Sequence, residues 1–206
     1  MQNTGKALWG APKPKLALVL ALFSMAAMAH IRQGDVGGGF LAGVHHPLAG
    51  LDHVIAMVAV GIWGAQLGTP AIWILPITFP MVMAVGGALG ALGVPIPGIE
   101  IGIALSGIVL GSFVAFVARP PLVVAAIVVG LFAIFHGHAH GAELPASANA
   151  ISYAAGFVVA TGALHACGIL IGVANRWPRG ARVLQLLGGL IAAGGSYFLY
   201  AHLAGA

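Results

Sequence analysis

Six apolar segments of bilayer-spanning length constrain the fold of this chain more than any other feature of its sequence. They cover residues 47–67, 71–93, 97–118, 121–138, 149–173 and 181–203, and Gly, Pro and polar residues separate them. Only 6% of the residues are charged, against about 25% in a soluble domain, so most of the surface must face lipid. The sequence therefore predicts an all-α integral membrane protein, with about six transmembrane helices in a single domain of residues 30–206.

Residues 1–29 have the three parts of a cleavable signal peptide. Three lysines precede a short apolar run that begins at Leu16, and a small-x-small sequence, Ala-Met-Ala, occupies 27–29. The apolar run is about fourteen residues long, whereas about twenty are needed to span a bilayer. We predict cleavage after Ala29, which leaves His30 with a free amine and a ring that can both bind a metal ion. An uncleaved leader would form a seventh helix and would not change the orientation of the others.

The arginines predict how the six helices are oriented. Arg119 lies between the third and fourth segments, and three more arginines lie between the fifth and sixth, so both loops are on one side of a six-helix chain. By the positive-inside rule that side is cytoplasmic, and the mature N-terminus is periplasmic in a bacterial inner membrane. The net charge of +4 is too scattered for nucleic-acid binding. Lipid and a metal ion are the partners we expect, and no feature of the sequence predicts an oligomeric state.

A first polar cluster lies at the start of the first segment and consists of His46 and, after five residues, Asp52 and His53. Ionisable groups inside a membrane are costly and usually functional. On a straight helix His46 and His53 are about 10 Å apart along the axis, so they share one ion only if the chain bends between them. The alternative is a hydrogen-bonded Asp–His pair that only links helices.

A second polar cluster lies at the end of the fourth segment and just beyond it. His136, His138 and His140 alternate with small residues, and Glu143 follows. On a helix His136 and His140 lie one turn apart on one face, whereas all three histidines share a face if the segment is extended. Imidazole and carboxylate ligands suit Ni, Co, Zn or Cu(II) rather than Ca or Mg. A solvated histidine-rich loop is the alternative.

The histidines gather on one side of the predicted membrane. In the predicted topology all except His165 lie on the side opposite the four arginines of those two loops, and the positive-inside rule does not sort neutral imidazole. Because neither cluster alone supplies a closed site, we expect the outer ends of segments 47–67 and 121–138 to meet. His165 is too deep in the fifth segment to reach solvent, and we expect it to serve in transport or to support the site; the alternative is a core histidine with satisfied hydrogen bonds.

Both clusters resemble signatures of the HupE/UreJ family of bacterial membrane proteins. The first signature, His, five residues and Asp-His, matches residues 46–53, and the second, Phe-His-Gly-x-Ala-His-Gly-x-Glu, matches residues 135–143. The family is associated with nickel supply to hydrogenase and urease, and its members are regarded as nickel, sometimes cobalt, permeases. The resemblance implies metal-binding roles for His46, Asp52, His53, His136, His140 and Glu143. The sequence pattern adds weaker candidates, namely His30, His138 and His165.

Two functions remain open at the level of sequence. The first is capture of a divalent transition-metal ion, nickel or cobalt, at the periplasmic face and its transport inward, without the nucleotide-binding motif G-x-x-x-x-G-K-[ST], which the chain lacks. The second is an intramembrane zinc-dependent hydrolase in which the same histidines hold zinc and Asp52 or Glu143 activates water. Polar groups continuing from the site towards the cytoplasm favour transport, and a closed apolar floor favours the enzyme. The bound metal ion is the only cofactor we expect.

Overall fold

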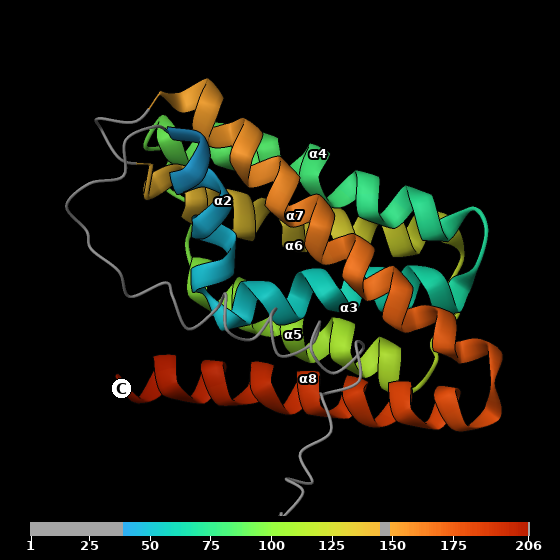
Figure 1. The fold of residues 1–206 in the computed structure, drawn as a ribbon. Coiled ribbons are helices and arrows are strands. Elements are labelled where there is room, and N and C mark those ends of the chain that lie inside the picture. The colour runs from blue at the N-terminus through green and yellow to red at the C-terminus, as the bar shows by residue number, and fades with distance from the viewer. Residues whose placement is uncertain (1–38, 145–148, 206) are drawn as a thin grey trace, which may run out of the picture. The chain divides into compact units, whose positions relative to one another are not determined.

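A computed structural model describes residues 39–144 and 149–205 of the chain. The predicted signal peptide and His30 lie outside these residues. Within them the chain forms helices and no strands: α2 (Gly39–Ala49), α3 (Leu51–Leu67), α4 (Ala71–Ala91), α5 (Ile99–Ala115), α6 (Leu122–Ala142), α7 (Ala150–Gly172), the 3-10 helix η2 (Val173–Arg176) and α8 (Pro178–Ala204) (Figure 1). Each of the six predicted segments contains a helix, so the all-α prediction is confirmed.

Fewer than the predicted six helices are long and apolar enough to cross a bilayer. Among the described residues, α4, α6, α7 with η2, and α8 are long and apolar enough to cross a bilayer. The pair α2 and α3 passes the same test together but bends by 84° between the two helices. A count of six therefore needs α5 to cross as well, although this apolar helix has only 17 residues. The chain is a multi-pass membrane protein whose described residues contain four candidate spans, or five if the bent pair is one span, so the predicted count of six is not confirmed.

Two predicted helix bounds were wrong, and both errors bear on the histidines. Pro47 does not open the first span, because the chain is already helical from Gly39 and Pro47 lies near the end of α2. The fourth helix does not end near His138 but continues to Ala142. In the sequence alone, Gly137 and Gly141 would permit a break in that helix.

The two glycines serve helix packing instead. A Cβ added at Gly137 would collide with the Met83 carbonyl, and one added at Gly141 would collide with the Gly87 carbonyl. The absence of a side chain at these positions lets α6 lie directly against α4, as small residues often do in membrane proteins. The second histidine cluster is therefore helical and rigidly supported.

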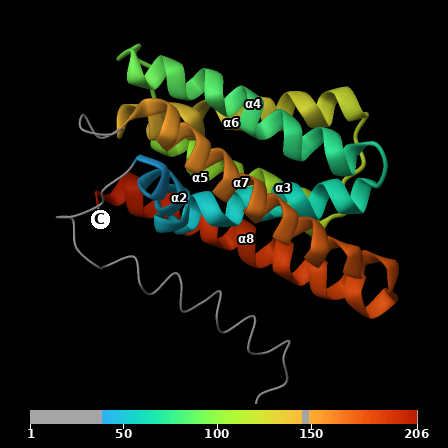
Figure 2. The same cartoon turned by 45° about the horizontal axis from the view of Figure 1, so that its top comes forward.

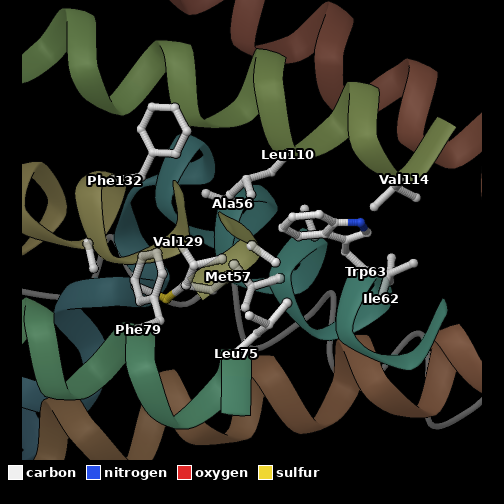
Figure 3. Close-up of a cluster of buried hydrophobic side chains, with 14 of the residues drawn as sticks. Ala56, Met57, Ile62, Trp63, Leu75, Phe79, Leu110, Val114, Val129 and Phe132 are labelled. Carbon is white, nitrogen blue, oxygen red and sulfur yellow. The ribbon is translucent and has the colours of Figure 1, made fainter. Parts of the chain in front are cut away.

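Helix α3 is the centre of the bundle. It packs against α2, α4, α5, α7 and α8, while α4 pairs with α6 and α5 with α8 (Figures 1 and 2). Its inner residues, among them Met57 and Trp63, belong to the buried apolar cluster drawn in Figure 3. This arrangement presents the N-terminal end of α3, with Asp52 and His53, to the surrounding helices.

Candidate metal site

A sharp bend brings the first histidine cluster together. Helix α2 ends at Ala49, Gly50 is extended, and α3 starts at Leu51 in a new direction at 84° to α2 (Figure 1). The bend turns the end of α2, with His46, back over the start of α3. This is the condition under which His46 and His53 were expected to contribute to one site.

Four imidazoles from three helices form a continuous row. The ring centroids of His46 and His140 are 4.7 Å apart, those of His140 and His53 are 4.4 Å apart, and those of His53 and His136 are 4.6 Å apart. The two signature segments therefore meet, as the sequence predicted. We call these four side chains the imidazole row.

The outer end of the imidazole row has the composition of a metal site. His46 Nε2 is 3.0 Å from Glu143 Oε2, and one ligand atom each from His46, His140 and Glu143 lie within 4.8 Å of one another. Ligands bound about 2.0–2.2 Å from one ion lie roughly 3–4 Å apart, so a small shift of His140 would complete the group. The Glu143 side chain is 63% exposed, which leaves this end of the row open to solvent.

Asp52 orients the ring of His53. Its Oδ1 accepts hydrogen bonds from His53 Nδ1 and from the His53 backbone N–H, both at 2.9 Å. Because the carboxylate accepts a proton from Nδ1, the lone pair lies on Nε2, which has no other hydrogen-bond partner in the described structure. A carboxylate behind a metal-binding histidine is a common arrangement. Asp52 was predicted as a metal ligand; its carboxylate is hydrogen-bonded to His53 in this structure, and its role in metal binding stays a prediction.

Ser106 on α5 sets the tautomer of His136 in the same way. Its single hydroxyl proton is donated to the Ile103 carbonyl at 2.6 Å, so it accepts from His136 Nε2–H at 2.8 Å. The lone pair of His136 is then on Nδ1, which is buried and has no partner among the described residues. The sequence analysis missed Ser106. A serine within an apolar span was the available signal.

His140 occupies the middle of the row and is nearly buried, at 6% exposure. Neither of its ring nitrogens has a hydrogen-bond partner within residues 39–144 and 149–205. Buried polar atoms almost always have partners in folded proteins. Unpaired nitrogens on His53, His136 and His140 are therefore suited to a ligand that supplies the missing interactions, such as a metal ion.

The remaining candidates lie apart from the row. His138 points to the other side of α6, where its Nε2 bonds to the Val94 carbonyl at 2.7 Å. His165 lies on α7 and contacts Phe79. His30 lies outside the described residues. Two aromatic residues of α7 that the sequence analysis missed, Tyr153 and Phe157, pack against the rings of His46 and His140.

Comparison with known proteins agrees with the motifs. Residues 18–198 match the family model described as HupE / UreJ protein. The chain belongs to the HupE/UreJ family. It is 46% identical to Protein HupE of Rhizobium leguminosarum bv. viciae over 185 aligned residues. The alignment covers 90% of this chain and 97% of that protein. No solved structure matches the chain.

In this HupE/UreJ protein both signature segments contribute histidines to the imidazole row. The first crosses the bend from α2 to α3, and the second forms the last two turns of α6. Their histidines join in one row instead of forming two separate clusters. Ser106, which lies outside the signatures, holds the ring of His136 in position.

Proposed function

We propose that this protein captures a divalent transition-metal ion, nickel or cobalt, at the periplasmic face of a bacterial inner membrane and passes it inward. The observation that carries the proposal is the imidazole row, which leads from an exposed carboxylate into the bundle. Membership of the HupE/UreJ family, which is consistent with nickel or cobalt transport, supports the same conclusion.

Exposure falls from the outer end of the row to its inner end. The side chain of Glu143 is 63% exposed and that of His46 is 23% exposed, whereas His136 is fully buried. Neighbouring rings are less than 5 Å apart, so an ion that leaves one imidazole already has the next within reach. Overlapping sites of moderate affinity are what conduction needs, because a single tight site would retain the ion.

The charges favour inward movement. The carboxylates of Glu143 and Asp52 offset the charge of a divalent ion at the outer end of the site. All four arginines of the described residues are exposed at the opposite ends of the helices: Arg119 follows α5, and the other three are in η2 and the start of α8. This distribution suits a cytoplasmic location for that end. A divalent ion entering a negative cytoplasm gains about 4.6 kcal/mol per 100 mV.

The surroundings of the row suit an ion better than a hydrolysable substrate. A cavity of about 250 Å³ between α4, α6 and α7 includes His140 in its wall, but its other lining residues are almost all apolar. A hydrolase also needs a carboxylate or similar base beside a metal-bound water. Asp52 is engaged by His53, and Glu143 contacts His46 near the solvent. These observations favour transport over the zinc-dependent hydrolase.

The proposal is tested by uptake of Ni²⁺, Co²⁺ and Zn²⁺ into proteoliposomes with a controlled membrane potential. His140→Ala removes the central imidazole and should abolish uptake. His138→Ala is the matched control, because it removes an imidazole from the same helix that faces away from the row. Equal uptake by both variants, or no metal uptake by the unchanged protein, would refute the proposed function.

A further inference from the structure

An apolar ring separates the imidazole row from a fifth histidine. Phe79 on α4 is completely buried and belongs to the apolar cluster shown in Figure 3. Its ring centroid is 5.5 Å from that of His136 and 5.4 Å from that of His165. Phe79 therefore contacts the inner end of the imidazole row and His165 at the same time.

His165 and Thr161 are buried polar residues without partners. Both are at most 1% exposed, and neither the ring nitrogens of His165 nor the Thr161 hydroxyl oxygen makes a hydrogen bond in the described part of the chain. They are four residues apart on α7, so their side chains lie on one face of the helix. Unpaired polar groups in the interior of a membrane protein are costly, and they usually mark the path of a polar ligand.

A backbone carbonyl oxygen adds a third possible metal ligand beside His165 and Thr161. Pro80 has no N–H, so the carbonyl of Pro76 lacks the donor that residue i+4 normally supplies in a helix. This carbonyl lies beside the ring of His165 without a completed hydrogen bond. Helices interrupted in this way often direct carbonyl oxygens towards ions in membrane transporters.

We propose that His165, Thr161 and the Pro76 carbonyl form a second, inner station for the divalent ion, separated from the imidazole row by Phe79. The inference rests on the proposed transport function and extends it. One imidazole and two neutral oxygens bind a transition-metal ion more weakly than the row with its carboxylates does. Weak binding on the inner side suits release towards the cytoplasm.

A further polar group lies nearer the cytoplasmic end of α3. The backbone of His165 crosses α3 at Gly61, where an added Cβ would collide with the His165 carbonyl. Gln66 lies five residues further along α3, about 7.5 Å towards the cytoplasmic end. Its Nε2 donates to the Val114 carbonyl at 3.1 Å, while its Oε1 is buried and has no partner among the residues described. Gln66 Oε1 is thus one unpaired polar atom below His165, within an otherwise apolar part of the core.

The inner station is tested in the full-length protein by measuring two quantities for each variant: Ni²⁺ binding in detergent and Ni²⁺ uptake in proteoliposomes. His165→Asn keeps a polar side chain but removes the imidazole. We expect its Ni²⁺ binding at the imidazole row to stay close to that of the unchanged protein, while uptake falls about tenfold or more. Cys167→Ala, a half-buried change two residues away, is the matched control and should leave both quantities unchanged.

The outcomes separate this inference from the proposed function. Normal uptake by both His165→Asn and the isosteric Thr161→Val would overturn the inner station alone and leave the imidazole row as the transport site. No uptake by the unchanged protein would overturn both. Recovery of Zn²⁺ uptake in His165→Cys, which replaces imidazole with another metal ligand, would support the inner station against a purely structural role.

Discussion

Ser106→Ala is the sharpest test of how the site is built, because Ser106 touches the site only through His136. The change removes the acceptor of the 2.8 Å hydrogen bond from His136 Nε2–H. His136 is fully buried, so its N–H would be left without a partner, at a cost of about 1–3 kcal/mol. The ring would also be free to turn or to change tautomer, which would remove the Nδ1 lone pair from the row.

The expected loss of metal affinity follows from the same interaction. Removing a group that supports a metal ligand typically lowers affinity about 10- to 100-fold, which equals about 1.4–2.8 kcal/mol and agrees with the cost of the lost hydrogen bond. Equilibrium dialysis of Ni²⁺ against purified protein measures this affinity. Ser196→Ala is the control, because Ser196 makes a comparable bond to a helix carbonyl, at 2.9 Å, but on the exposed part of α8.

The two serine variants also separate binding from folding. Both lose a bond between a hydroxyl and a backbone carbonyl, so a general effect on helix stability should appear in both. A Ser106→Ala protein with unchanged Ni²⁺ affinity would refute the argument that this hydroxyl fixes the metal-binding tautomer. A comparable loss of affinity in Ser196→Ala would show that the effect does not arise at His136.

Three further predictions concern the charge, the packing and the processing of the chain. Asp52→Asn keeps an oxygen that can accept from His53 but removes the negative charge, so we expect a folded protein with reduced Ni²⁺ uptake; normal uptake would leave Asp52 a purely structural role. Gly141→Ala should lower the unfolding free energy by about 1–3 kcal/mol in a thermal or denaturant assay, because α4 and α6 must separate, whereas Gly162→Ala faces open space and should not destabilise the protein. Mass spectrometry of the membrane-resident protein should give a chain that begins at His30, and an intact Met1 would disprove cleavage.

Much of the fold follows from the sequence because the membrane makes local composition decisive. A helix satisfies its own backbone hydrogen bonds, so an apolar stretch of sufficient length folds as a helix whatever its neighbours are. All six apolar segments were found for this reason. The histidines could be identified as candidate site residues from the sequence as well, because ionisable residues are rare in and beside apolar membrane segments.

The bounds of the helices were predicted less well where glycine and proline occur. Gly137 and Gly141 look like breaks when α6 is read alone, but they are the points at which α6 meets α4. Pro47 looks like the start of a span, but it lies near the end of α2. The conformations of these residues depend on the neighbouring helix or on the bend, which the local sequence does not describe.

The sequence by itself determined which residue types gather at the outer end of the helices, since the signatures contain His46, His53, His136 and His140 in positions that a helix places on defined faces. Only the tertiary structure decided their order in space, because the row depends on an 84° bend between α2 and α3 and on contacts between residues about ninety positions apart. It also decided that His138 faces away, that Ser106 supports His136, and that Phe79 lies between His136 and His165. Each of these results comes from side chains of different helices packing together, and such packing leaves no periodic signal in any one helix.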